Sequence, residues 1–84
     1  MNLYLLTRTD HGGYDTYDSA VVCAESEEHA RDTHPDGRGR ISEREEPNPN
    51  YGTWVAPETV NVELIGHAAP LLEAGVVCSS FNAG

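Results

Sequence analysis

Hydrophobic residues are grouped in four short runs along this chain, and turn-forming or charged residues separate each run from the next. The runs are rich in β-branched and aromatic residues, which is typical of β-strands rather than of long helices. The pattern therefore predicts four strands. They cover residues 3–6, 20–24, 59–65 and 76–81.

The third run, TVNVELI, has the most regular alternation of apolar and polar residues. Val60, Val62 and Leu64 fall on one side of it, while Asn61 and Glu63 fall on the other. Because successive side chains of a strand point to opposite faces, this pattern predicts a half-buried strand of an antiparallel sheet.

A short helix is predicted directly after the second run. Ser26 is a suitable N-cap, and Glu27 and Glu28 follow it where the helix dipole favours carboxylates. Glu27 and Arg31 are four residues apart, in the order that favours an ion pair. The turn sequence HPDG at 34–37 is expected to end the helix after roughly two turns.

The remaining segments are predicted as turns and one long loop. Gly12 and Gly13 allow a hairpin between the first two strands, and a short helical turn is expected at 68–74. Residues 35–53 contain prolines and glycines but one aliphatic residue, Ile41, so no regular structure is expected there. A loop of that length is either functional or disordered.

These elements predict one α+β domain over residues 1–84, with a four-stranded, mostly antiparallel sheet and the short helix packed on one face. A chain of 84 residues supports only a thin core, because it buries about 60% of its unfolded surface. We expect the opposite face of the sheet to be wet and acidic. The expected core residues are Leu3, Leu5, Val22, Trp54, Val62, Leu64, Leu71 and Val76.

The charge of the chain is strongly one-sided. Fourteen acidic residues against five arginines give a formal net charge of −9. Such a charge repels nucleic acid and anionic membranes and attracts basic surfaces, so neither nucleic acid nor membrane is expected as a direct partner. The acidity serves either solubility alone or a basic partner. Without a long apolar segment, the expected location is the cytoplasm.

No motif indicates catalysis or a bound cofactor. Ser79 and Ser80 lack a nucleophile-elbow sequence, and no glycine-rich run opens a helix in the way a phosphate site requires. The histidines lack the spacing of a zinc site and are expected at the surface or at a helix end. These histidines are His11, His29, His34 and His67.

Two further sets of residues have both a structural and a chemical interpretation. Cys23 and Cys78 lie in apolar runs and are expected to be free buried thiols, with a disulfide or metal role as the alternative. Asp10, Asp15 and Asp18 offer oxygen ligands for a hard cation, but their spacing is not that of a helix–loop–helix calcium site. We therefore expect no enzyme, no cofactor and no metal.

The most distinctive feature is tyrosine interleaved with carboxylate in YDTYD at 14–18, followed by glutamates at the start of the helix. A tyrosine ring can cover the aliphatic stem of arginine or lysine while a carboxylate pairs with the charged head. Carboxylates along a strand and a helix can also imitate the phosphates of a duplex. For Tyr17, packing on the sheet is the alternative. The predicted partner-binding residues are Tyr14, Asp15, Tyr17, Asp18, Glu25, Glu27 and Glu28.

The segments YDTYDSAVV, AES, EEHAR, HPDG, WVAPETVNVELIG and GVVCSSFNAG together resemble a family of small acidic proteins encoded by bacteriophages and prophages. The resemblance covers the whole chain, most weakly at 35–53, and carries over no catalytic residue. It implies a phage accessory protein, a class that includes inhibitors of host defence such as anti-CRISPR proteins. The expected function is to block a basic, nucleic-acid-binding surface of a host defence complex, such as a CRISPR effector. The alternative is a small phage domain that binds a ligand or metal.

Overall fold

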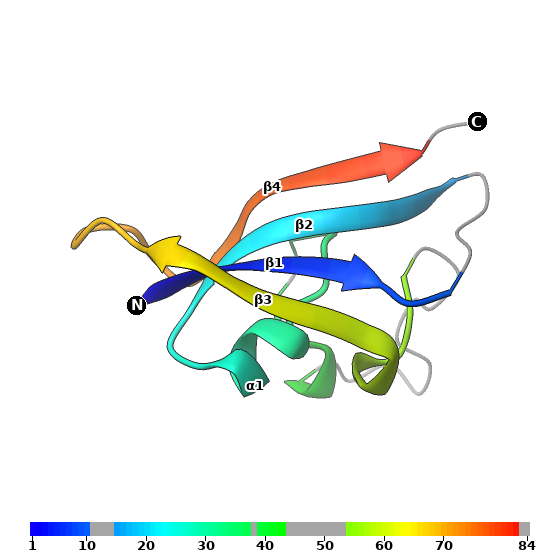
Figure 1. The fold of residues 1–84 in the computed structure, drawn as a ribbon, viewed down its shortest axis with the longest axis horizontal. Helices are drawn as coiled ribbons and strands as arrows, with labels where there is room; N and C mark the ends of the chain where they lie inside the picture. The colour runs from blue at the N-terminus through cyan, green and yellow to red at the C-terminus, as the bar shows by residue number, and fades with distance from the viewer. Residues whose placement is uncertain (11–14, 38, 44–53, 83–84) are drawn as a thin grey trace.

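Four strands form a single antiparallel sheet in this computed structural model, which describes residues 1–10, 15–37, 39–43 and 54–82 (Figure 1). Across the sheet the strands lie in the order β3-β1-β2-β4, so the two strands that come first in the sequence lie at its centre. The predicted α+β fold with a four-stranded antiparallel sheet is confirmed. The strands are β1 (Asn2–Arg8), β2 (Thr16–Ala24), β3 (Val60–His67) and β4 (Gly75–Asn82).

The predicted helix is α1 (Glu27–Arg31), and it packs on one face of the sheet against β1, β2 and β3 (Figure 1). The Ser26 hydroxyl accepts a hydrogen bond from the backbone N–H of His29 at 3.2 Å, which confirms the N-cap. Glu27 and Arg31 approach to 3.7 Å, as their spacing predicts. The helix is shorter than two turns because it ends at Asp32, which forms hydrogen bonds with the following segment instead.

Part of the predicted 35–53 loop is regular. Thr33 and Arg40 form an isolated β-bridge, and a short 3-10 helix follows at Ile41–Glu43. The backbone N–H of Ile41 donates to the carbonyl of Asp32 at 2.7 Å, and the Ile41 side chain is buried. The prediction of no regular structure is therefore wrong for this part. Residues 38 and 44–53 lie outside the described residues.

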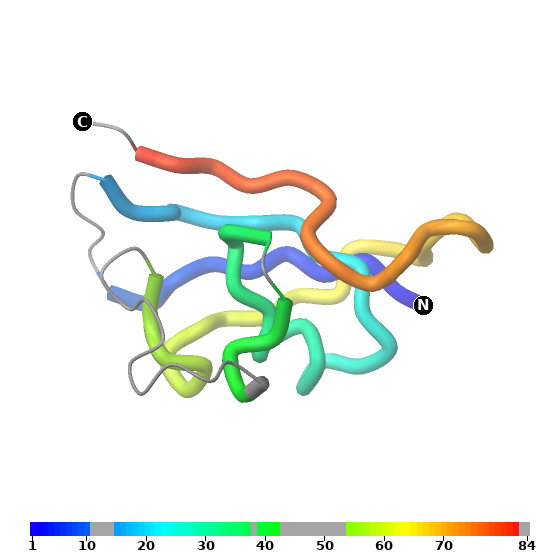
Figure 2. Tube along the Cα trace, turned by 180° about the vertical axis from the view of Figure 1, so that it is seen from behind, coloured from blue at the N-terminus to red at the C-terminus, as the bar shows by residue number. Residues whose placement is uncertain are grey.

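The segment at 68–74 connects one edge of the sheet to the other. It forms a hydrogen-bonded turn, in which Leu72 N–H donates to the Ala69 carbonyl at 3.0 Å, rather than the expected helical turn. Ala68 N–H donates to the carbonyl of Met1 at 3.0 Å, which anchors the connection to the start of β1. Figures 1 and 2 both show it projecting beyond that end of the sheet.

The core lies on the α1 side of the sheet, and its phase in β1 differs from the prediction. Tyr4 and Leu6 are buried, whereas Leu3 and Leu5 lie on the opposite face. The run of leucines has no polar member to set its phase, so the pairing of β1 with its neighbours decides which residues turn inward. The buried cluster comprises Tyr4, Leu6, Ala20, Val22, Ala24, Ala30, Ile41, Trp54 and Val60.

Of four other expected core residues, two pack against the core and two do not. Val62 and Val76 pack against the core while remaining partly exposed. Leu64 is 57% exposed and Leu71 is 94% exposed, so both predictions were wrong. These two leucines lie near or in the projecting connection, where the chain runs past the last elements that could cover them.

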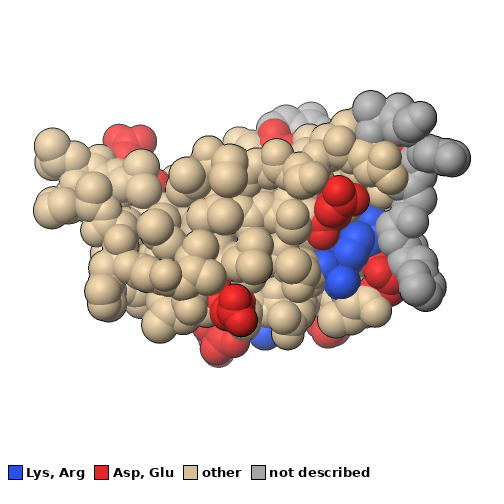
Figure 3. Space-filling model, turned by 45° about the horizontal axis from the view of Figure 1, so that its top comes forward, with Lys and Arg blue, Asp and Glu red and all other residues tan. Residues whose placement is uncertain are grey.

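The opposite face of the sheet is less acidic than expected. In an antiparallel pair, residues directly opposite each other share a face, and the register places Leu5 between Val21 and Glu63, with Cys78 beyond Val21. Of these four, only Glu63 is charged. Figure 3, in which the β4 side of the molecule comes forward, shows a broad uncharged surface with charges mainly at its margins. The prediction of an acidic face was wrong because, apart from Glu63, the carboxylates of the described residues lie toward the ends of the strands or outside them.

We expect Leu6→Ala to lower the free energy of unfolding by about 2–5 kcal/mol, because it opens a cavity among fully buried side chains. Leu5→Ala makes the same chemical change one residue away on the partly exposed face and should cost clearly less. Denaturant unfolding followed by circular dichroism measures both. A larger loss for Leu5→Ala would show that the two faces of β1 are assigned the wrong way round.

Candidate acidic binding surface

The predicted partner-binding residues fall into two groups at opposite ends of β2. The strand spans nine residues, and its ends are roughly 25 Å apart at the usual rise of a strand. The residues therefore do not form one continuous surface, and Tyr14 lies outside the described residues. The hairpin group comprises Asp15, Tyr17 and Asp18, and the helix group comprises Glu25, Glu27 and Glu28.

The two aspartates of the hairpin group are held by β4. Asp15 has a positive φ of 57°, a conformation that Asp and Asn tolerate better than most residues. Its backbone N–H donates to the carbonyl of Asn82 at 2.6 Å. The hydroxyl of Ser80 donates to the carboxylate of Asp18 at 3.0 Å. Both carboxylates are exposed, but each belongs to a strand end that is fixed by its neighbours.

Arg8 partly neutralises the hairpin group. Its Nε donates to the carboxylate of Asp10 at 2.6 Å, and its Nη1 donates to the carbonyl of Tyr17 at 3.2 Å. The hydrogen bond to Asp10 raises the pKa of Arg8, the negative charges of Asp10 and Asp18 raise it further, and burial acts in the opposite direction. This guanidinium is therefore a fixed cation beside the aspartates.

Tyr17 has a structural role. Its ring meets that of Phe81 edge-on, with 4.8 Å between centroids, and that of His34 with 6.1 Å between centroids. The side chain packs against the core and is only partly exposed. Of the two interpretations left open by the sequence, packing on the sheet is the one that these contacts support.

The helix group keeps more of its negative charge. Glu25, Glu27 and Glu28 are all exposed, and among the described residues only Glu27 is paired with an arginine, Arg31. The Arg31 guanidinium also donates to the backbone carbonyls of Val60 and Pro57. Arg31 is therefore tied to β3 as well as to the helix.

Glu25 lies 4.0 Å from Nδ1 of His29, a contact that becomes an ion pair only when the imidazole is protonated. Glu25 and Glu28 have no arginine ion pair within the described residues, which makes them the least balanced carboxylates of the helix group.

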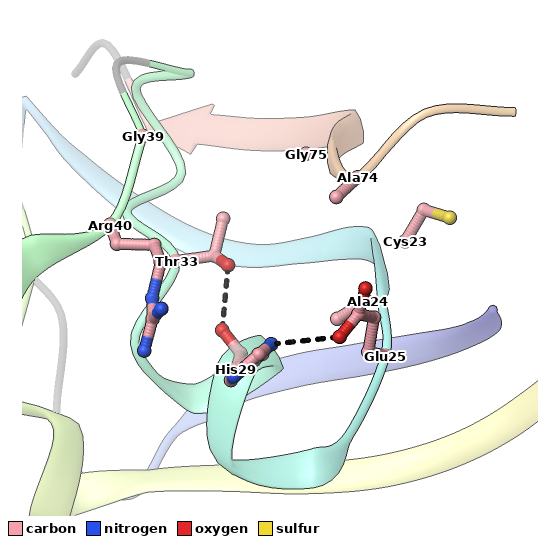
Figure 4. Close-up of a pocket in the computed structure, with 9 residues that line it drawn as sticks. All are labelled: Cys23, Ala24, Glu25, His29, Thr33, Gly39, Arg40, Ala74 and Gly75. Atoms are coloured by element: carbon pink, nitrogen blue, oxygen red, sulfur yellow. Dashed lines mark hydrogen bonds and ion pairs between the residues drawn. The ribbon is translucent and has the colours of Figure 1, made fainter.

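A pocket of about 200 Å³ adjoins the helix group (Figure 4). Its walls come from four segments: the end of β2, α1 with the residues after it, the 39–40 segment and the start of β4. Sequence reasoning did not find it, because no single segment carries a signal for a cavity that tertiary packing assembles. The lining residues are Cys23, Ala24, Glu25, His29, Thr33, Gly39, Arg40, Ala74 and Gly75.

The polar groups around this pocket are largely engaged with one another. The Thr33 hydroxyl donates to the carbonyl of His29 at 2.9 Å, and Nε of Arg40 donates to the carboxylate of Asp32 at 3.1 Å. The Cys23 sulfur points away from the other lining side chains in Figure 4. Glu25 therefore supplies the most available charge at the pocket, beside apolar walls.

Every arginine in the described ranges is held by a carboxylate of the same chain. Arg8 pairs with Asp10, Arg31 with Glu27 and Arg40 with Asp32. Exposed carboxylates such as Asp15, Glu25 and Glu28 are left without an arginine partner within the described part of the chain. The surplus negative charge of the surface is thus not balanced internally.

The histidines differ from the prediction at one position. His34 is fully buried, and its Nδ1 accepts a hydrogen bond from the backbone N–H of Asp36 at 3.0 Å. His29 is partly exposed near the end of α1, and the exposed His67 contacts Asn2 at 2.9 Å. His11 lies outside the described residues. His34 is buried because the turn after α1 folds back under Tyr17, which the sequence did not indicate.

The cysteines are both free, as predicted, but only Cys23 is buried while Cys78 is exposed. The expected burial of Cys78 was wrong because Cys78 lies opposite Val21 on the face of the sheet that α1 does not cover. Among the residues that the structure places, no three His, Cys, Asp or Glu side chains are grouped in a way that could hold a metal ion. The three aspartates considered for a hard cation include Asp10, which is engaged by Arg8.

No protein-family model, curated protein or solved structure matches this chain. None of the helices in the described ranges has the length and apolar character needed to cross a membrane. The functional argument therefore rests on the surface and the pocket themselves.

We expect His34→Ala to lower the free energy of unfolding by about 2 kcal/mol or more, since it empties a buried site and leaves the Asp36 N–H without its acceptor. His67→Ala, at an exposed position, should change it by no more than about 0.5 kcal/mol. Thermal unfolding of both variants provides the measurement. Equal melting temperatures would mean that His34 is not a core residue.

Proposed function

We propose that this chain is a non-enzymatic binding protein that occupies a basic surface of a partner protein, as an inhibitor of a host defence complex would. The observation that carries the proposal is the internal engagement of Arg8, Arg31 and Arg40 by carboxylates of the same chain. With a formal net charge of −9, the remaining carboxylates must be balanced from outside. A surface that normally binds nucleic acid offers the complementary charge.

The helix group is the better contact surface of the two. Glu25 and Glu28 are exposed and have no arginine ion pair in the described residues. In the hairpin group, Asp18 interacts with the positive charge of Arg8 and accepts a hydrogen bond from Ser80. The neighbouring pocket has apolar walls from Ala24 and Ala74. Such walls can cover the aliphatic stem of a lysine or arginine while Glu25 meets its charged head.

The inhibitor and nucleic acid would compete for the same basic surface of the partner. Carboxylates on α1 would take the positions of phosphates, so the partner could not hold its duplex while the inhibitor is bound. The basic channel of a CRISPR effector is a partner of this chemistry, in keeping with the phage-family resemblance of the sequence.

A second candidate function is the binding of a small molecule, and the pocket of about 200 Å³ is the observation that favours it. A ligand of that size would contact His29, Thr33 and the walls of the pocket rather than the exposed carboxylates of α1. Native mass spectrometry of the chain purified from host cells separates the candidates, because a ligand-binding domain would retain a small molecule and an inhibitor would retain a nucleic-acid-binding complex.

We expect the double change Glu25→Gln and Glu28→Gln to weaken partner binding by about tenfold or more, because it removes two charges that meet lysines or arginines. Immobilised chain incubated with host lysate, with the retained nucleic-acid-binding complex quantified, measures this effect. Binding of the unmodified chain should also fall as salt rises, since the Debye length shrinks from about 10 Å at 0.1 M to about 3 Å at 1 M.

The matched control is the double change Asp15→Asn and Asp18→Asn, which removes the same charge at the other end of β2 and suits the positive φ of Asp15. It should retain binding. Loss of binding in this control alone would move the site to the hairpin group, and equal loss in both would show that net charge rather than α1 governs binding. Retention that does not respond to salt would contradict the proposal as a whole.

A further inference from the structure

The connection between β3 and β4, residues 68–74, is named here the connecting arm, and exposed apolar side chains gather on it and beside it. Leu71 is 94% exposed, the highest value among the exposed large hydrophobic residues of the described ranges. Scattered exposed leucines need no explanation, whereas a group of them marks an interaction site. Of seven such exposed residues, five lie at this end of the molecule: Met1, Leu64, Ile65, Leu71 and Leu72.

Backbone hydrogen bonds hold the connecting arm in shape. The N–H of Leu72 donates to the carbonyl of Ala69 at 3.0 Å, and the N–H of Ala68 donates to the carbonyl of Met1 at 3.0 Å. Pro70 is the second residue of the turn from Ala69 to Leu72, a position that its fixed φ favours. Leu71 is therefore presented to solvent by an ordered turn, so that binding through it costs little conformational entropy.

The connecting arm and the helix group border the same pocket. Glu25 and His29 line one part of its wall, and Ala74 and Gly75, at the end of the arm and the start of β4, line another part (Figure 4). Figures 1 and 2 both place the arm at the same end of the molecule as the connection from β2 to α1. The exposed leucines are thus continuous, through this pocket, with the carboxylate of Glu25.

We infer that the connecting arm is the apolar part of the surface that meets the basic partner, and that the partner carries apolar side chains beside its lysines or arginines. The inference rests on the proposed function and adds a second feature to the chemistry of the partner. Leu71 packs on those apolar side chains while Glu25 and Glu28 pair with the cations.

Charge selects this occupant for the arm. Glu73 is exposed directly after Leu72, Glu25 lies across the pocket, and the chain carries a formal net charge of −9. A second copy or an anionic membrane would bring like charges together at this end of the molecule. A basic surface instead gains from the same carboxylates while it covers the leucines.

The two parts of the surface respond differently to salt. Pairing of exposed carboxylates with lysines weakens as salt rises, because mobile ions screen it. Burial of Leu71 removes apolar surface from water and involves no charge. A contribution from the arm should therefore persist at salt concentrations where the contribution of Glu25 and Glu28 has declined.

Calorimetric titration of the full chain with two synthetic peptides of equal length and charge tests the inference. One peptide alternates lysine with leucine, and the other alternates lysine with serine. We expect the lysine–leucine peptide to bind about tenfold more tightly or better, since its apolar side chains can cover Leu71. Both affinities should fall as salt rises, while the preference for the lysine–leucine peptide persists.

Three variants separate the arm from the carboxylates. Leu71→Ser should abolish the preference between the peptides, and Leu71→Met, which keeps an apolar side chain, should retain it. Because Leu71 is almost fully exposed, neither change disturbs the core. The double change Glu25→Gln and Glu28→Gln should weaken the binding of both peptides and leave the preference intact.

Equal affinity for the two peptides, or a preference that survives Leu71→Ser, overturns the inference and leaves the proposed function standing. Failure of both peptides to bind at low salt contradicts the proposed function and the inference together. Sedimentation of the chain alone and flotation with phosphatidylcholine vesicles test the other occupants. Self-association or vesicle binding that Leu71→Ser abolishes would assign the arm to a second copy or to a membrane, and either result overturns the inference.

Discussion

The pairing of β1 with β2 is the constraint on which the rest of this molecule depends. It places Tyr4 opposite Val22 and Leu6 opposite Ala20, so that one face of the central strands meets α1 and the buried Trp54. A shift by one residue would turn Leu3 and Leu5 inward and expose Tyr4 and Leu6. That alternative register is unfavourable because large buried rings fill the α1 side of the sheet, whereas the side chains on the other face are smaller.

Asp32 links this core to the functional surface. Its carboxylate accepts hydrogen bonds from the backbone N–H of Ser42 and from Nε of Arg40, and its carbonyl accepts from Ile41. These bonds end α1, bring Ile41 into the core and place Arg40 at one wall of the pocket. The ion pair with Asp32 therefore neutralises Arg40, whose positive charge would otherwise weaken the acidic surface beside it.

A single-sided core has consequences for the surfaces that the domain presents. Because only one face of the sheet is covered by α1, the other face and the β4 edge remain exposed, while the carboxylates gather at the strand ends and on the helix. Acidic and uncharged surfaces are thus spatially separated. Such a separation leaves the carboxylates near α1 grouped on a surface of their own, apart from the uncharged face of the sheet.

The sequence by itself determined the elements that depend on local chemistry. The four strands, the Ser26 cap, the ion pair of Glu27 with Arg31 and the acidity all follow from residue types a few positions apart, and the structure agrees with them. Tertiary structure alone decided the phase of β1, the burial of His34 and Ile41, the exposure of Cys78 and the separation of the carboxylates into two groups. Each of these depends on strand pairing or on contacts between distant segments, which periodicity within one segment does not encode. The pocket beside Glu25 is of the same kind, because its four walls meet only after the sheet has formed.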